Sequence, residues 1–267
     1  MHADMRCFRN GRLEYHRSRP AGEEFWGSHW REHFSADTYR GYDQGSLGQH
    51  NAIFDAILPR HGLILEAGCG MGQLVMGLNR RGFSCEGVEY SLETVERVKE
   101  LHPDLPIRHG DVTALDVPDG HYAALLSLGV VEHRPEGPEP YLAEAWRVLA
   151  PGGTAFISVP WLNPLRRFKA GCGAFRGSPG SGHRFYQYAF SRRELGEFLT
   201  RAGFEVLRWH PYGGWKGLAD ELPGLKSLLS KGLVTRHHKA CLNRHPFVLR
   251  LAGHMIAAIC RKPGASS

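Results

Sequence analysis

From about residue 62 onward, short apolar runs alternate with amphipathic stretches. The apolar runs have the length of strands and lie at 62–66, 84–89, 106–109, 122–128, 154–159, 204–208 and 254–260. Between them, apolar residues at helical spacing predict helices over 73–81, 92–101, 140–149 and 192–202. Strands that alternate with helices in this way predict an α/β protein with a doubly wound, mostly parallel sheet.

Three segments lie outside the regular alternation. Residues 1–60 are rich in aromatic side chains, and we expect 1–50 to form an N-terminal helical lid or extension of a domain over 51–267. That domain has two expected insertions. The first, at about 161–190, is rich in Gly and Arg, and the second, at about 211–250, is basic and helical. Leucines between 218 and 233 form an apolar stripe, which favours a helix facing the core or a lid over a membrane helix.

Composition is ordinary for a soluble globular protein, with 42% hydrophobic and 22% charged residues. The six cysteines form no CxxC or zinc-ligand spacing, and the polar N-terminal stretch has no apolar signal core, so a cytoplasmic location with reduced thiols is expected. Charge is uneven along the chain. Residues 61–160 hold 7 Lys or Arg against 14 Asp or Glu, while 161–267 hold 18 against 5. The acidic middle favours a cationic ligand, and the basic tail an anionic substrate, membrane surface or nucleic acid, or only a solvated face.

The stretch ILEAGCGMGQ at 64–73 places three glycines at alternate positions after the first expected strand. A dinucleotide fingerprint needs GxGxxG, but here the pattern is GxGxG, and Gln73 takes the place of the third fingerprint glycine. Glu66 lies at the strand end, two residues before Gly68. A carboxylate there would repel a pyrophosphate and favour a ligand with an ammonium and a sulfonium. The loop therefore favours S-adenosylmethionine over NAD.

Two more acids follow strand ends. Glu89 ends the second expected strand in GVEYS and can accept hydrogen bonds from both hydroxyls of a ribose. Asp111, in HGDVTAL, follows the third strand, where its carboxylate and the backbone N–H of Val112 can recognise an adenine. Each acid alone could be a turn or capping residue. Together with Glu66, at successive strand ends, they predict one nucleoside site.

Five segments in sequence order carry a family resemblance: LEAGCGMG (65–72), GVEYS (87–91), GDVTALDV (110–117), YAALLSLGVVEH (122–133) and LAPGGTAFISVP (149–160). In them, and over about residues 45–210, the chain resembles the class I S-adenosylmethionine-dependent methyltransferases, which have a Rossmann-like fold. The resemblance implies a seven-stranded sheet whose last strand, GHMIAAIC, is antiparallel. It also implies S-adenosyl-L-methionine as cofactor and S-adenosyl-L-homocysteine as product. The cofactor contacts it implies are Glu66, Ala67, Gly68, Gly70, Gln73, Glu89, Tyr90, Asp111, Val112 and Ser127.

His133, in VVEHRPEG, follows the fourth expected strand and is the candidate catalytic residue. An oxygen acceptor must lose a proton as it is methylated, and histidine suits a base that works near neutral pH. Glu132 could face backbone or a metal instead, and the pair could simply cap the next helix. No metal site is expected from the sequence. The Asn/Asp-Pro-Pro-Tyr/Phe motif typical of methylation at base or amide nitrogen is absent, which favours a small-molecule or lipid acceptor.

The insertion WLNPLRRFKAGCGAFRGSPGSGHRFYQYAFS is loosely similar to that of quinone-biosynthesis O-methyltransferases and of relatives encoded with glycan-modifying enzymes. Arg166, Arg167, Lys169 and Arg176 alternate there with aromatic residues, so the segment could contact anionic headgroups or close over an anionic acceptor. Candidate acceptor contacts are His183, Arg184 and Tyr186. At least two of the aromatics of FYQYAF are expected instead to pack beneath the sheet.

The leading hypothesis is therefore a methyltransferase that acts on a small-molecule, lipid or glycan acceptor, on oxygen. Two alternatives stay open at this point. One is a non-catalytic S-adenosylmethionine-binding protein. The other is an RNA methyltransferase that uses the basic C-terminal third, which the missing nitrogen-methylation motif makes the weaker reading. The sequence indicates neither the acceptor nor the oligomeric state.

Overall fold

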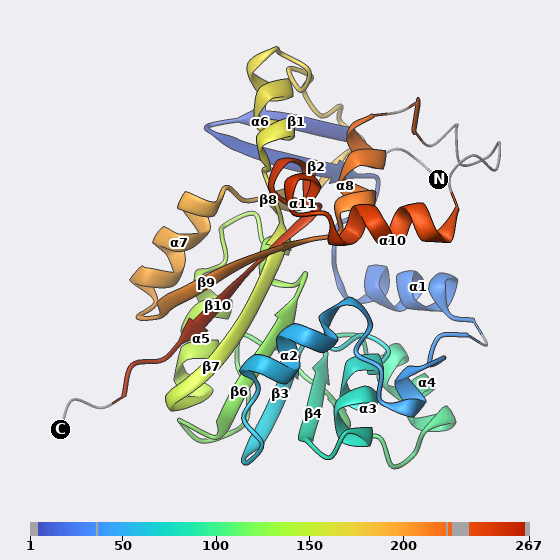
Figure 1. The fold of residues 1–267 in the computed structure, drawn as a ribbon, viewed down its shortest axis with the longest axis vertical. Helices are drawn as coiled ribbons and strands as arrows, with labels where there is room; N and C mark the ends of the chain where they lie inside the picture. Colours follow the sequence, from blue (N-terminus) through green and yellow to red (C-terminus); the bar gives the residue numbers. More distant parts are fainter. Residues whose placement is uncertain (1–4, 36, 223, 226–234, 265–267) are drawn as a thin grey trace.

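The fold centres on a seven-stranded sheet, seen in a computed structural model that describes residues 5–35, 37–222, 224–225 and 235–264 (Figure 1). The strand order is β5-β4-β3-β6-β7-β10-β9. The strands are β3 (Leu63–Ala67), β4 (Ser84–Glu89), β5 (Ile107–His109), β6 (Tyr122–Leu128), β7 (Leu149–Pro160), β9 (Glu205–Tyr212) and β10 (Met255–Arg261). β3 to β7 pair in parallel, and β10 is antiparallel to both β7 and β9. The expected sheet with an antiparallel last strand is confirmed.

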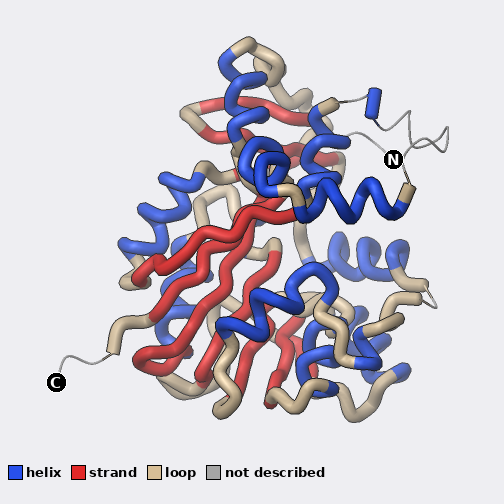
Figure 2. The backbone as a smooth tube through the Cα atoms, in the orientation of Figure 1, coloured by secondary structure: helices blue, strands red, loops and turns tan. Residues whose placement is uncertain are grey.

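Helices cover both faces of this sheet (Figure 2). On one face lie α2 (Asn51–Ile57), α3 (Gln73–Arg80) and α4 (Leu92–Leu101), and on the other α5 (Glu139–Val148) and α7 (Arg192–Arg201). Strand β6 shows why its sequence is apolar throughout. Leu126 packs with the first set of helices and Leu125 with the second, because successive side chains point to opposite faces.

A second, antiparallel sheet contains strands from both ends of the first 190 residues. Its order is β1 (Met5–Arg9), β2 (Arg12–Arg17) and β8 (Arg184–Ala189). The expectation of a helical lead-in is therefore wrong for residues 5–17, which form a hairpin. Asn10 and Gly11 have positive φ angles of 50° and 80° at the turn. An Asn-Gly turn between two strand-like runs is a strong hairpin signal, and it was present in RCFRNGRLEY.

The remaining helices come from the N-terminal segment, the loop after β6 and the two insertions. They are α1 (Glu23–His33), η1 (Tyr42–Gln44), η2 (Gly48–His50), η3 (Val131–His133), α6 (Pro164–Gly171), α8 (Gly214–Glu221), α10 (Arg236–Arg244) and α11 (Pro246–Ala252). The second insertion is helical where it is described, beginning after Tyr212. Half of the leucines of the stripe expected over 218–233 lie outside the described residues. No helix in the described part of the chain is long and apolar enough to cross a bilayer.

Candidate functional site

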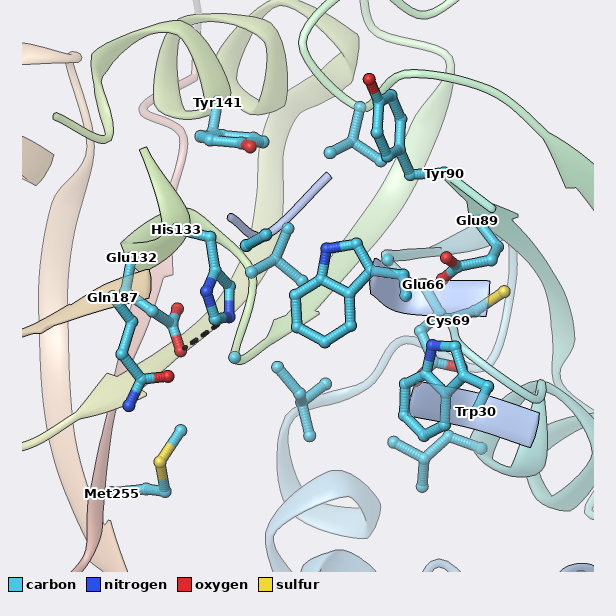
Figure 3. Close-up of a pocket in the computed structure, with 18 of the residues that line it drawn as sticks. Trp30, Glu66, Cys69, Glu89, Tyr90, Glu132, His133, Tyr141, Gln187 and Met255 are labelled. Carbon is cyan, nitrogen blue, oxygen red and sulfur yellow. Dashed lines mark ion pairs between the residues drawn. The ribbon is translucent and has the colours of Figure 1, made fainter. Parts of the chain in front are cut away.

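A cavity of about 740 Å³ opens beyond the carboxyl ends of β3, β4 and β6 (Figure 3). This volume is within the range of pockets that enclose small ligands. The part that we call the acidic half is lined by Glu66, Gly68, Cys69, Glu89 and Asp111. The part that we call the histidine half is lined by Glu132, His133, Tyr186, Gln187 and Met255. The cavity thus lies where ligands bind on parallel sheets.

The glycine loop between β3 and α3 has a backbone conformation that residues with a side chain rarely adopt. Gly68, Gly70 and Gly72 have φ angles of 76°, 54° and 71°. A Cβ atom on Gly68 would lie 2.5 Å from a methyl group of Val130, and one on Gly70 2.5 Å from the Trp30 ring. The Gly70 amide donates to Glu89 Oε2 at 2.8 Å. The alternate glycines are therefore required by conformation and by close packing.

Two carboxylates lie buried in the acidic half, and neither forms an ion pair with a lysine or arginine of the described residues. Glu66 accepts a hydrogen bond from the Val75 amide at 3.2 Å, and burial raises its pKa to about 8, with a smaller contribution from Glu89. Glu89 accepts from the amides of Gly70 and Ser91, at 2.8 and 3.0 Å, and burial also raises its pKa. An ammonium or sulfonium brought beside these groups would offset the cost of burying their charge. This donor set fits S-adenosylmethionine.

Asp111 lies at the rim of the acidic half and is exposed. Its Oδ1 accepts hydrogen bonds from the backbone amide and the hydroxyl of Thr113, at 2.8 and 2.7 Å. These bonds orient the carboxylate. Oδ2 makes no hydrogen bond in the described part of the chain, which leaves an oxygen available to a ligand.

The indoles of helix α1 cover the cavity. Trp26 and Trp30 both line it, and Trp30 lies against Gly70. The helix is held near α4, since the Leu92 amide donates to Glu23 Oε1 at 3.2 Å. Farther along, the Tyr39 hydroxyl donates to the Met71 carbonyl at 2.9 Å. Aromatic residues of the N-terminal segment thus lie over the glycine loop, where they can exclude water.

His133 lies in the histidine half, with its side chain almost wholly buried. Its Nδ1 lies 2.8 Å from the Tyr186 carbonyl oxygen. Since that oxygen can only accept, Nδ1 carries the proton and Nε2 is left as the basic nitrogen. Burial lowers the pKa of His133 to about 4, so the imidazole is neutral at pH 7. Trp26 and Tyr186 flank the ring, with centroids 4.9 Å away in each case.

The structure brings most, but not all, of the expected site residues to the cavity. Seven of the expected cofactor contacts line it, namely Glu66, Gly68, Gln73, Glu89, Tyr90, Asp111 and Val112. Ala67 and Ser127 instead line a small hollow on the α5 side, and Gly70 lies under Trp30. Among the expected acceptor residues, His133 and Tyr186 line the cavity. His183 and Arg184 are exposed and lie outside its lining.

Several cavity residues were not expected from the sequence, or were not given this role. They are His50, Glu132, Gln187, His254 and Met255. His50 and His254 come from segments that carry no motif and reach the cavity only through the fold. Glu132 is next to the expected base His133. Its role could not be predicted because the sequence does not show that the Glu132 side chain is buried. Gln187 alternates with the buried Tyr186 and Tyr188 on β8, a pattern that could have indicated a strand beside the site.

The cations of the first insertion are not all available to a ligand. Arg166 is fully buried and donates from Nε to Glu221 Oε1 at 3.0 Å. Lys169 Nζ lies 2.8 Å from Glu221 Oε2. Both therefore neutralise a buried carboxylate, and the expectation that they meet headgroups or an anionic acceptor is wrong. Arg167 remains exposed, next to Phe168.

Comparison with known proteins gives one consistent result. Residues 65–157 match a family model described as a methyltransferase domain. A Mycolicibacterium smegmatis protein described as a "Probable S-adenosylmethionine-dependent methyltransferase" is 34% identical over 146 residues, covering 54% of this chain and 52% of that protein. A ubiquinone biosynthesis O-methyltransferase of Alkalilimnicola ehrlichii is 28% identical over 106 residues, covering 38% and 42%. The chain thus spans about half the length, or less, of these curated relatives.

The fold agrees with solved structures. A chain from the complex between the Haloferax volcanii Trm112 methyltransferase activator and a methyltransferase has a TM-score of 0.58. It is 15% identical, with coverage of 91% of this chain and 97% of that chain. At this identity the likeness concerns the fold alone.

Proposed function

We propose that residues 65–157 form a class I, S-adenosylmethionine-dependent methyltransferase domain and that the protein transfers a methyl group from S-adenosylmethionine to a small-molecule acceptor. Glu66 carries the proposal, because it is a buried carboxylate beside the glycine loop that pairs with no lysine or arginine of the described residues. A dinucleotide pyrophosphate would meet that charge at close range, whereas a cationic amino acid portion would neutralise it.

Isothermal titration with S-adenosylmethionine, S-adenosylhomocysteine and NAD tests this proposal. The first two should bind and NAD should not. Binding of NAD without binding of S-adenosylmethionine would contradict it. Binding of the cofactor without turnover on any acceptor would favour a non-catalytic binding protein.

Within the cavity, each half has its own task. When bound, the cofactor supplies a methyl group activated by its sulfonium. Glu66, Glu89 and Asp111 would hold its ammonium, ribose and adenine in the acidic half. Trp26 and Trp30 would exclude water, so that the two reactants meet in a dry, oriented arrangement. Methyl transfer by displacement needs little more from the protein when the acceptor is already a nucleophile.

We further propose that the methylated atom is oxygen and that His133 removes its proton. The neutral imidazole presents Nε2 as a base, since Nδ1 is engaged with the Tyr186 carbonyl. Glu132 Oε1, 3.9 Å from Nε2, would stabilise the imidazolium that forms. The similar proteins include both an O-methyltransferase and an N-methyltransferase, so the support for oxygen is the placement of His133 together with the lack of the motif typical of methylation at base or amide nitrogen. A hydroxyl on a small lipid or glycan would suit the same geometry. Membrane contact, if used, would rest on exposed residues such as Arg167 and Phe168.

A further inference from the structure

Glu132 is a buried acid in the cavity whose charge nothing in the described part of the chain neutralises. It is only 1% exposed. Its Oε2 has no hydrogen-bond partner among the described residues, and its Oε1 lies 3.9 Å from His133 Nε2, beyond hydrogen-bond distance. In Figure 3 the carboxylate and the imidazole point toward one another inside the cavity. A buried carboxylate rarely lacks hydrogen-bond partners unless a ligand supplies them.

Two of the groups near Glu132 are bonded elsewhere. The Nδ1 of His133 is engaged with the Tyr186 carbonyl at 2.8 Å. The charge of Glu132 contributes to the raised pKa of Tyr212, but the Tyr212 hydroxyl donates to Ser158 Oγ at 2.9 Å. Burial therefore raises the pKa of Glu132 to about 8, with no lysine or arginine to oppose the shift. The missing partner must come from the cavity itself.

Acidic side chains outnumber lysine and arginine side chains in the described lining of the cavity. Its carboxylates are Glu66, Glu89, Asp111 and Glu132, and the one lysine or arginine in its described lining is Arg134. The histidines His50, His133 and His254 do not compensate, because burial lowers the pKa of each to about 4. Burial raises the pKa of both Glu66 and Glu132 to about 8, so each of these acids ionises at neutral pH only when a cation lies beside it. The ammonium and sulfonium of S-adenosylmethionine would serve the acidic half, and a separate cation in the histidine half would complete Glu132.

We propose that the methyl acceptor carries an amino group that binds Glu132, next to the hydroxyl that faces His133. This inference rests on the proposed function and names the acceptor class of the same site. The short separation of Glu132 and His133 places the two groups on neighbouring atoms of the acceptor, as in an amino alcohol. Trp26 and Tyr186, which flank His133, provide an aromatic surface for the body of the molecule. An anionic acceptor, one of the possibilities raised by the basic insertion, does not suit this lining.

Three probes of matched shape test the inference. They are 2-amino-1-phenylethanol, its neutral analogue 1-phenylethane-1,2-diol, and mandelate, which carries a carboxylate at that place. Their binding is measured with S-adenosylhomocysteine present. The amine should bind the wild-type protein about 10- to 100-fold more tightly than the diol, as expected for a hydrogen bond to a charged group. Mandelate should bind most weakly.

The variant Glu132→Gln keeps the shape and removes the charge, so the preference for the amine should fall to within about threefold while diol binding stays nearly unchanged. The control Glu136→Gln, in the same loop with a side chain 69% exposed, should keep the preference. S-adenosylhomocysteine binding and the unfolding midpoint show whether each variant is folded. Equal binding of amine and diol by the wild type, an amine preference that survives in Glu132→Gln, or no binding of any probe at its solubility limit would overturn the inference.

Cofactor binding separates this inference from the proposed function. Loss of S-adenosylhomocysteine binding in the wild type would defeat the proposed function, whereas intact binding without an amine preference would defeat the Glu132 inference alone. Product analysis after incubation with S-adenosylmethionine distinguishes the reacting atom. An O-methyl product supports both proposals, and an N-methyl product supports the amine site while overturning oxygen as the nucleophile.

Discussion

Glu221 and Glu132 are the same residue type at nearly the same burial, 2% and 1% exposed, in two different regions of the molecule. Glu221, on α8, is surrounded by Arg6, Arg166 and Lys169, with N···O distances of 2.5, 3.0 and 2.8 Å. Burial alone would raise the pKa of Glu221, but these three cations outweigh it and lower the pKa. Glu132 has no such cation, and its pKa is raised to about 8.

The difference separates a structural carboxylate from one available to a ligand. The three cations come from β1 and α6, so Glu221 ties the small sheet and the first insertion to α8. Its interactions are complete without any ligand. Glu132 lines the cavity with one oxygen unpartnered. Burial by itself therefore says little about role, whereas the presence or absence of a counter-charge distinguishes the two regions.

The largest effect is expected on the cavity side of this comparison. His133→Ala should lower turnover about 100- to 10,000-fold, the usual contribution of a positioned general base. Cofactor affinity and stability should change little, since His133 acts on the acceptor. Single-turnover kinetics together with titration of S-adenosylhomocysteine check this. Full activity would make His133 a packing residue, and a parallel loss of cofactor affinity would make it structural.

A large loss of stability is expected when Glu221 is changed. Glu221→Gln leaves Arg6, Arg166 and Lys169 without their common anion, and unfolding free energy should fall by about 3–5 kcal/mol. Urea unfolding monitored by fluorescence measures it. The matched control is Glu205→Gln, whose carboxylate pairs with Arg261 at a half-exposed site, 48% exposed, and should lose at most about 1 kcal/mol. Equal losses in both variants would remove the contrast between the buried cluster and a surface pair.

The smallest of the three effects is a gain in stability. Burial raises the pKa of Glu132 from 4.5 to about 8, so the folded state binds a proton that the unfolded state releases between these values. The contribution of Glu132 to the unfolding free energy of the wild type is therefore fully present below pH 4.5 and is lost as pH rises through 8. Glu132→Gln removes that loss and should be more stable than the wild type by roughly 2–4 kcal/mol above pH 8, with no difference near pH 4.

The pH dependence gives the two carboxylates opposite signs. Because the pKa of Glu221 is lowered, its contribution is present above its ordinary value of 4.5 and is lost as pH falls. Urea unfolding of each Gln variant and the wild type across pH measures both trends. A Glu132→Gln variant that is less stable than the wild type at pH 9 would mean that Glu132 has a partner in the free protein.

Much of the fold could be predicted from local patterns. Apolar runs and helical spacing placed the strands and helices of the main sheet within a few residues, since both signals depend on neighbours along the chain. The N-terminal hairpin could also have been predicted from its Asn-Gly turn, whereas the aromatic content of the same segment suggests a helix. Arg166 and Lys169 were placed on the surface by composition. Their partner, Glu221, is more than fifty residues away, and no local pattern shows it.

By itself the sequence determined the parallel sheet, the glycine loop and the acids at successive strand ends, because strand period and strand order bring Glu66, Glu89 and Asp111 to one edge. Only the tertiary structure decided which charged residues are neutralised. Arg166 is neutralised because the fold brings α6 to Glu221 on α8, and Glu132 keeps an oxygen without a partner among the described residues because the cavity lies beside it. Desolvation and pairing depend on contacts between distant segments, so a carboxylate of the same type can stabilise the fold in one region and await a ligand in another.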